Sequence, residues 1–75
     1  MVEIPNSSID RIIRKGGAKR VAKSAILALQ KELEEYGIEI ARSAWELASY
    51  AGKKTLEDKD IVLALRKQKL GELEI

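Results

Sequence analysis

The fold is decided by residues 22–52, which read AKSAILALQKELEEYGIEIARSAWELASYAG. Apolar side chains recur there at three- and four-residue intervals, which is the spacing of a helix that buries one face. The large members of this stripe are Ile26, Leu29, Leu33, Tyr36, Ile40, Leu47 and Tyr50. A second stripe holds the small residues Gly37, Ala41, Ala44, Ala48 and Ala51. The pattern predicts one helix over about residues 22–50, roughly 40 Å long at about 1.5 Å per residue.

A shorter helix is predicted ahead of this stretch, over about residues 8–15. Its apolar face consists of Ile9, Ile12 and Ile13. Ser7 is the expected N-cap, because its hydroxyl can accept a backbone N–H of the first turn and Asp10 follows close behind it, as in a capping box. The pair Gly16-Gly17 is expected to end this helix, since glycine readily adopts helix-terminating conformations.

A third helix is predicted after Thr55, where Asp58 completes a Thr-x-x-Asp capping box. Its apolar face consists of Ile61, Val62, Ala64 and Leu65. It is expected to end by Gly71, ahead of a short tail. The chain is therefore expected to be all-α, with a short, a long and a short helix in that order.

Such a chain is expected to need a partner. Two short helices cannot cover both sides of a helix of roughly 40 Å, so a lone chain would expose a large apolar patch. The chain has 75 residues and contains neither Cys nor His, which excludes disulfides and the usual zinc sites. A second copy crossing the first is the simplest remedy, and Gly37, near the middle of the long helix, would let two helices approach closely.

Both stripes contribute to the expected dimer core, which consists of Leu29, Leu33, Tyr36, Gly37, Ile40 and Ala44. Trp45 is expected to be buried against the third helix, since large aromatic side chains are highly buried on average. The whole chain, residues 1–75, is expected to form one domain. Residues 1–6 would be an N-terminal arm and residues 68–75 a C-terminal extension.

Composition excludes several classes of function. Neither His nor Cys is present to act as a base, nucleophile or metal ligand, and the carboxylates alternate with Lys and Arg as on solvated helix faces. Residues 52–55 look like the end of a phosphate-binding loop, but that motif requires other residues where the chain has Leu47 and Lys54. No apolar stretch approaches the roughly 20 residues of a membrane span. We expect no enzyme, no metal, no cofactor, no small-molecule substrate and no membrane partner.

Four blocks of sequence occur together in an order typical of one family. They are Ile9-Asp10-Arg11-Ile12-Ile13-Arg14, Gly17-Ala18-Lys19-Arg20-Val21, Leu33-Glu34-Glu35, and Ala51-Gly52-Lys53-Lys54-Thr55-Leu56 followed by Asp60-Ile61. On these blocks the chain resembles the archaeal histones over about residues 4–67. The resemblance implies the histone fold, in which two chains clasp head to tail in a handshake dimer. It also implies binding of duplex DNA and a place on the chromosome in the cytoplasm.

Basic residues gather at the two breaks between the predicted helices, where helix starts add partial positive charge that suits phosphate. The candidate DNA-binding residues are Arg11, Arg14, Lys15, Lys19, Arg20, Lys23, Lys53, Lys54 and Thr55. The net charge is only +2, so the placement of these residues carries the argument. Contacts of this kind position DNA without reading bases, so sequence preference should come mainly from bendability.

The resemblance also implies roles for single residues. Arg20 resembles the family's arginine that reaches the minor groove, and Thr55 resembles the residue that holds it. Lys54 resembles the phosphate contact of the second loop. Lys53 and Asp60 resemble the ion pair that fixes this loop.

A larger assembly than the dimer is left open. Leu47, Tyr50 and Asp60 fall where the family joins dimer to dimer, but the family often has His at the Tyr50 position, and a tyrosine lacks its charge switch. The extension adds the apolar residues Leu70, Leu73 and Ile75. One hypothesis is that they make a different contact between dimers, so that the protein bridges duplexes, and the alternative is a tail that folds back or frays.

Two other interpretations fit parts of the sequence. The chain could be a histone-fold interaction subunit that pairs with a different chain and binds no DNA itself, although the basic clusters argue against this. It could also be a plain coiled coil, but the stripe of Gly and Ala makes the apolar face too wide for a two-stranded seam. A helix-turn-helix is excluded because the central helix is too long.

Overall fold

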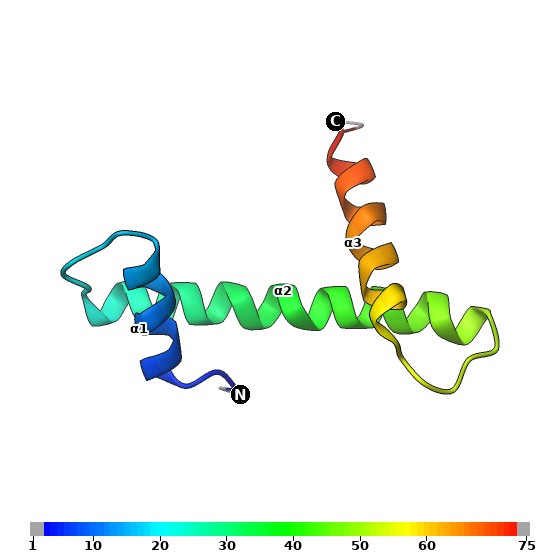
Figure 1. Ribbon diagram of the computed structural model, residues 1–75, viewed down its shortest axis with the longest axis horizontal. Coiled ribbons are helices and arrows are strands. Elements are labelled where there is room, and N and C mark those ends of the chain that lie inside the picture. Colours follow the sequence, from blue (N-terminus) through cyan, green and yellow to red (C-terminus); the bar gives the residue numbers. More distant parts are fainter. Residues whose placement is uncertain (1–2, 74–75) are drawn as a thin grey trace. The chain divides into compact units, whose positions relative to one another are not determined.

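The computed structural model describes residues 3–73, and the side chains of residues 3–69. Three helices follow one another, α1 (Asn6–Lys15), α2 (Lys23–Tyr50) and α3 (Asp58–Leu73) (Figure 1). No strand occurs in the described part of the chain. The expected all-α class and the order of the helices are confirmed.

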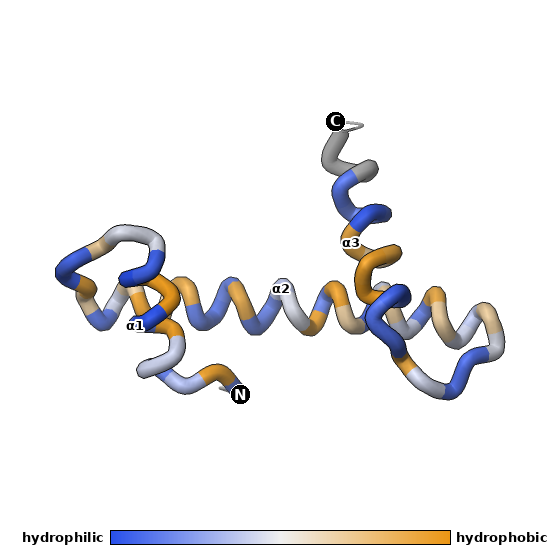
Figure 2. Tube along the Cα trace, viewed as in Figure 1, coloured by the Kyte–Doolittle hydropathy of each residue, from blue (hydrophilic) through white to orange (hydrophobic). Residues whose placement is uncertain are grey.

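The chain divides between Tyr36 and Gly37, inside α2, into two compact units. The first unit holds α1 and the beginning of α2, and the second holds the remainder of α2 and α3. Apolar and polar residues alternate along both parts of α2, as Figure 2 shows. None of the described helices combines the length and apolarity needed to cross a membrane.

Pro5 starts α1, and the expectation that Ser7 caps this helix is wrong. The carbonyl of Pro5 accepts the N–H groups of Ser8 and Ile9, at 3.1 and 3.2 Å, and no side-chain cap is formed. The proline ring fixes φ, here −61°, so the chain enters the helix directly at Asn6. Ser7 therefore lies within the first turn.

Gly16 and Gly17 end α1 as expected. The N–H of Gly17 donates to the carbonyl of Arg14 at 3.0 Å. Gly17 then adopts a φ of +112°, a conformation that side chains with a Cβ rarely reach. The chain thereby leaves the helix axis and enters the first loop, residues 16–22.

The core of the first unit contains a polar clamp beside the fully buried Ile9. Gln30 of α2 is 4% exposed, and its Nε2 donates to the carbonyl of Ile4 at 2.6 Å and to Oδ1 of Asn6 at 2.8 Å. One turn further, Glu34 Oε2 accepts the N–H groups of Glu3 and Ile4, both at 2.9 Å. The described part of the N-terminal arm is thus fastened to α2 by hydrogen bonds between its backbone and the side chains of Gln30 and Glu34.

The core of the second unit is small and built largely of alanine. Ile40, Ala44 and Ala64 are buried together, and Ile61 packs against them. Small side chains allow α2 and α3 to pack closely here. Trp45 lies one residue beyond this face and is 45% exposed, so the expectation that it is buried against α3 is wrong for the single chain.

A Schellman motif ends α2. The N–H of Lys53 donates to the carbonyl of Ala48 and the N–H of Gly52 to that of Ser49, both at 3.0 Å. Gly52 has the positive φ, +78°, that this motif requires. The second loop, residues 51–57, therefore begins at a defined angle to the end of α2.

Glu57 starts α3, and the expected Thr55–Asp58 capping box is wrong. The carbonyl of Glu57 accepts the N–H groups of Asp60 and Ile61, and Oδ2 of Asp60 accepts the N–H of Glu57 at 2.9 Å. Asp60 can do this because it lies three residues after the capping position, within reach of its N–H.

The expected end at Gly71 is also wrong, since α3 continues to Leu73. A glycine inside a helix costs only about 1 kcal/mol, which does not suffice to stop it. The proposed contacts of Leu70, Leu73 and Ile75 concern side chains outside the described residues.

Candidate functional site

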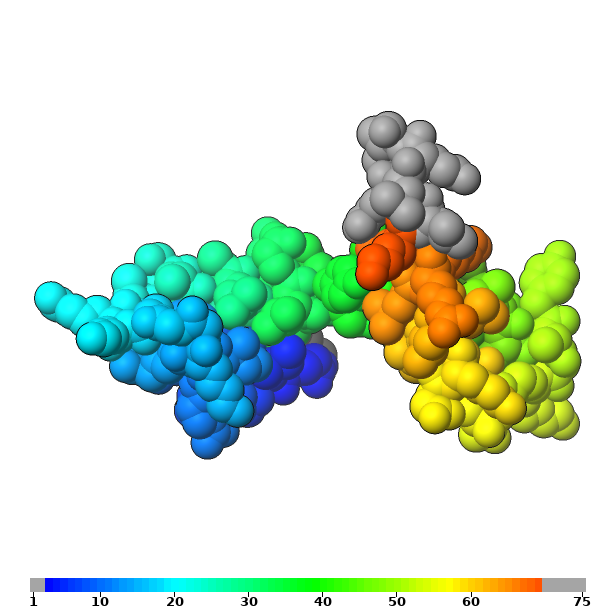
Figure 3. Space-filling view, turned by 45° about the horizontal axis from the view of Figure 1, so that its top comes forward, coloured from blue at the N-terminus to red at the C-terminus, as the bar shows by residue number. Residues whose placement is uncertain are grey.

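The first loop gathers basic side chains on the surface of the first unit. The six basic residues predicted to bind DNA in this unit are all exposed: Arg11, Arg14, Lys15, Lys19, Arg20 and Lys23. In the space-filling view the segment coloured cyan, which contains this loop and the start of α2, projects from the end of its unit (Figure 3). A projecting basic segment is accessible to a large anionic partner.

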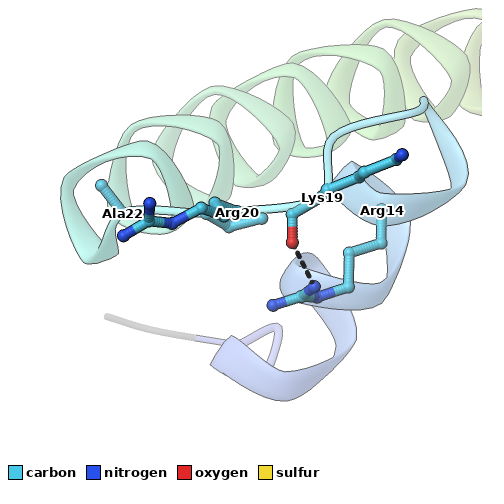
Figure 4. Close-up of a pocket in the computed structure, with 5 residues that line it drawn as sticks. Arg14, Lys19, Arg20 and Ala22 are labelled. Carbon is cyan, nitrogen blue, oxygen red and sulfur yellow. Dashed lines mark hydrogen bonds between the residues drawn. The ribbon is translucent and has the colours of Figure 1, made fainter.

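A hollow of about 510 Å³ lies within this cluster. It is lined by Arg14, Lys19, Arg20, Val21 and Ala22. Arg20 extends toward the start of α2, whereas the side chain of Lys19 points the opposite way (Figure 4). The first backbone N–H groups of α2 have no partner within a helix, so the helix start adds partial positive charge beside Arg20.

Arg14 connects α1 to the loop. Its Nε donates to Oδ2 of Asp10 at 3.0 Å, which is an ion pair one helical turn apart. Its Nη1 donates to the carbonyl of Lys19 at 2.9 Å (Figure 4). The guanidinium of Arg14 therefore joins a carboxylate on the helix to the backbone of the loop.

In the second loop, neighbouring lysines have different surroundings. Lys53 Nζ lies 2.7 Å from Oδ2 of Asp60 and 2.8 Å from Oε1 of Glu57. The hydrogen bond to Asp60, followed by the one to Glu57, raises the pKa of Lys53 above its ordinary value. The same bond from Lys53 lowers the pKa of Asp60, helped by the N–H of Glu57, and Lys53 also lowers the pKa of Glu57.

Lys54 and Thr55 are exposed and make no hydrogen bond or ion pair to the described residues. Lys53, by contrast, has its charge satisfied within the fold. The structure thus brings together Lys53 and Asp60, the two residues predicted to fix the second loop. Arg20 lies in the first unit and Thr55 in the second, so their pairing stays a prediction.

The residues predicted to form a dimer core differ in burial. Ile40 and Ala44 are buried in the core of their own unit. Leu29 and Leu33 are half-buried, and Tyr36 is 46% exposed. A methyl group added at Gly37 would meet no atom of the described chain within 4 Å.

Many other large apolar side chains are exposed on the single chain. They comprise Ile12, Leu27, Ile38, Trp45, Tyr50, Leu56, Val62, Leu63 and Leu65. Both units contribute to this set. Exposed apolar groups in this number leave much of the surface suited to contact with another protein chain.

Leu47 and Tyr50 line a second hollow, of about 380 Å³, together with Glu46, Ser49 and Lys67. Leu47 is half-buried, whereas Tyr50 is 96% exposed. Asp60, the third residue expected at a contact between dimers, is 8% exposed and directs Oδ2 to its own loop. Oδ1 of Asp60 takes part in neither of these hydrogen bonds.

Three residues that hold the first unit in shape were not predicted from the sequence. Asp10 pairs with Arg14, and the spacing of four residues on one helix was the available signal. Gln30 and Glu34 hold the arm from the middle of a helix, and local spacing gives no sign of contacts that span 24 to 31 residues. Among residues 3–73, no group of His, Cys, Asp or Glu is arranged to hold a metal ion.

Comparison with known proteins identifies the family. The family described as histone-like transcription factor (CBF/NF-Y) and archaeal histone matches residues 2–65. One subunit of the archaeal histone HAN1 of Thermococcus zilligii is 48% identical over 66 residues, which cover 88% of this chain and 98% of the relative. A protein named probable archaeal histone 3, of Methanocaldococcus jannaschii, is 41% identical over 66 residues, which again cover 88% of this chain and 98% of the relative. The chain belongs to the family of histone-like transcription factors and archaeal histones.

Proposed function

We propose that the chain binds and compacts duplex DNA, largely without sequence specificity, as a homodimer on the chromosome in the cytoplasm. At the level of its family it is a DNA-binding chromatin protein and not an enzyme. The observation that supports DNA binding by this chain is the exposed basic cluster of the first loop, which lies beside the start of α2.

Phosphate is the chemical group that suits this cluster. Lys19, Arg20 and Lys23 are cations on flexible, solvated side chains, and the first turn of α2 adds backbone N–H groups. Arg11 and Lys15 extend the positive surface along α1. Such contacts go to the DNA backbone, which is the same for every sequence, so we propose that preference arises only from how easily the duplex bends.

The second loop would add a smaller contact. Lys54 is exposed and unpaired in the described chain, whereas Lys53 is held by Asp60 and Glu57. We therefore assign phosphate contact to Lys54 and a structural role to Lys53. Thr55 beside Lys54 would hold Arg20 of a neighbouring chain as that arginine enters the minor groove.

A second copy of the chain is proposed as the cover for the exposed apolar side chains. Leu29, Leu33 and Tyr36 follow one another at intervals of four and three residues on one face of α2 and remain partly exposed. At about 25 cal/mol per Å² of apolar surface removed from water, covering such a face would stabilise a small chain substantially. In this proposal residues 1–75 act as one domain, and two copies cross near Gly37.

A second candidate is supported by a relative's name. The HAN1 relative is named as one of the subunits of an archaeal histone, so the protein to which this chain is similar belongs to an assembly with subunits. The exposed apolar face would serve a different histone-fold chain as well as a second copy. In that case the chain would be an interaction subunit that needs another chain and binds no DNA itself.

The deciding experiment is a titration of duplex DNA at several salt concentrations, together with the solution mass of the pure chain. The variants are Arg20→Gln and Lys54→Gln, with Arg42→Gln as a matched control that also removes one exposed positive charge but lies away from both loops. Each phosphate contact removed should make the negative slope of log K against log salt shallower by about 0.9, so a substitution carried by both chains of a dimer should change it by about 1.8, with no change for the control. A stable dimer that binds no DNA at low salt would refute DNA binding, and a molten or insoluble pure chain would favour the interaction subunit.

A further inference from the structure

We infer that Arg14 is a positioning residue, which holds the backbone of the first loop so that Lys19 and Arg20 meet DNA in a fixed geometry. This inference rests on the proposed DNA-binding function. It replaces the expectation that Arg14 is one more phosphate contact. Its effect on DNA is exerted through the loop.

Two of the three guanidinium nitrogens of Arg14 are already bonded within the chain. Nε is bonded to Asp10 Oδ2 at 3.0 Å and Nη1 to the carbonyl of Lys19 at 2.9 Å (Figure 4). The planar guanidinium presents its donors in fixed directions, so one side chain can serve two acceptors that lie apart. A lysine, with one compact ammonium group on a flexible stem, cannot reproduce this bridge.

The loop has little other support. Among the described residues, no backbone–backbone hydrogen bond involves residues 18–21. The carbonyl of Lys19 is the point at which a hydrogen bond attaches this stretch to α1. Fixing a residue in one conformation costs entropy, so a loop that is ordered beforehand loses less on binding.

The negative charge of Asp10 distinguishes a positioning role of Arg14 from direct contact with phosphate. Its carboxylate neutralises Arg14, although a negative charge near a DNA-binding surface should weaken binding. The side chains of Arg14 and Asp10 are 50% and 31% exposed, so this ion pair adds little to folding stability. Substitution of either residue should therefore leave the fold intact and expose the effect on the loop.

The test compares salt-dependent duplex titrations of the wild type with three variants. Arg14→Lys keeps the charge and loses the bridge, and Arg14→Ala loses both. Asp10→Ala removes the carboxylate that orients the guanidinium toward the Lys19 carbonyl and raises the net charge of the chain by one. Arg42→Lys is the matched control on the exposed surface of α2. We expect Arg14→Lys to bind about tenfold more weakly, as the loss of one charge-assisted hydrogen bond would give, with the salt slope of the wild type. Asp10→Ala should also bind more weakly, despite its added positive charge.

The opposite results would overturn the inference. If Arg14 contacts phosphate directly, Arg14→Lys should bind like the wild type and Arg14→Ala should make the negative salt slope of the dimer shallower by about 1.8. Tighter binding by Asp10→Ala would likewise show that Asp10 only screens a phosphate-binding arginine.

Backbone dynamics separate this inference from the proposed function. Amide ¹⁵N relaxation reports the order of residues 18–21 without any DNA. We expect lower order parameters in Arg14→Lys and Arg14→Ala and no change in Arg42→Lys. Unchanged order in Arg14→Lys would refute the positioning role even if DNA binding stands. Failure of the wild type to bind DNA at low salt would refute the proposed function, while relaxation would still decide whether Arg14 orders the loop.

Discussion

Lys53 and Asp60 share a short ion pair, 2.7 Å from Nζ to Oδ2, and the same carboxylate oxygen accepts the N–H of Glu57 at 2.9 Å. One oxygen atom therefore both fixes the second loop and satisfies the start of α3. The loop is held by a charge from the first turn of α3, Asp60, and by one of its own, since Glu57 Oε1 is a further partner of Lys53. Its neighbour Lys54 remains exposed.

Lys53→Gln and Lys54→Gln should therefore differ although they remove the same charge from adjacent positions. Lys53→Gln should lower the melting temperature by several degrees, because Asp60 loses its partner, and should change the salt slope of DNA binding little. Lys54→Gln should leave the melting temperature unchanged and make the negative slope shallower by about 1.8, since a dimer has two copies of Lys54. Thermal unfolding and DNA titration of both variants check this, and the reverse assignment of the two effects would contradict it.

The arm contact should make stability depend on pH through Glu34. The N–H of Ile4, followed by that of Glu3, lowers the pKa of Glu34 below its ordinary value of 4.5. Because the folded pKa is the lower one, the contact stabilises the fold fully above about pH 4.5 and this stabilisation disappears as pH falls through the folded pKa. Urea unfolding of Glu34→Gln should show a loss of stability at neutral pH that shrinks in acid.

Glu35→Gln is the control for this experiment, because Glu35 is the exposed neighbour of Glu34. It removes the same charge and leaves the arm contact intact. An equal loss of stability at neutral and acid pH in Glu34→Gln would show that its carboxylate does not hold the arm.

Gln30 should matter more for stability than its position on a polar stretch suggests. Gln30→Ala removes the buried donor to the carbonyl of Ile4 and to Asn6, so these groups lose their partners. Asn6 is exposed and Ile4 half-buried, so water can replace the lost donor in part, and we expect a loss of about 1 kcal/mol in the free energy of unfolding, the net value of a typical hydrogen bond. Lys31→Ala, at an exposed neighbouring position, should change it by less than about 0.5 kcal/mol.

The helices could be predicted from the sequence because their signals are local. The apolar period of α2 and the glycines after α1 and α2 act over a few residues, and they place the helix boundaries within about two residues. The caps of α1 and α3 were assigned to the wrong residues. Ser7 and Thr55 are good capping residues, but Pro5 and the Lys53–Asp60 pair fix where those helices begin.

The residue types of the site could be predicted from the sequence, but the hydrogen bonds and ion pairs of its side chains could not. Exposed Arg and Lys residues next to glycine breaks indicate a surface for phosphate, and the structure has them exposed around the first loop. The sequence does not distinguish Arg14, which is engaged by Asp10 and the Lys19 carbonyl, from Arg20, which is not. Whether a basic side chain is already bonded depends on distances in three dimensions, which the spacing of residues along the sequence does not determine.

Gly37 offers a test of the proposed dimer in which helix propensity and packing have opposite effects. Within the chain, a Cβ at Gly37 meets no described atom, so Gly37→Ala should stabilise α2 by up to about 1 kcal/mol if the chain is alone. If a partner helix crosses there, the same methyl group, or the larger side chain of Gly37→Leu, should weaken the dimer. Sedimentation over a range of concentrations measures this, and stronger association in both variants would exclude a crossing at Gly37.

Tyr50 decides whether dimers join through the hollow that it lines with Leu47. Its side chain is 96% exposed, so Tyr50→Lys should leave the fold of the chain unchanged. If a second dimer covers this surface, burying the added charge is unfavourable, and light scattering should show the mass falling to that of a dimer. Lys31→Ala, in the other unit, should leave the mass as in the wild type. A larger assembly that survives Tyr50→Lys must be held by another surface, since a contact centred on Tyr50 cannot accommodate an unpaired ammonium group.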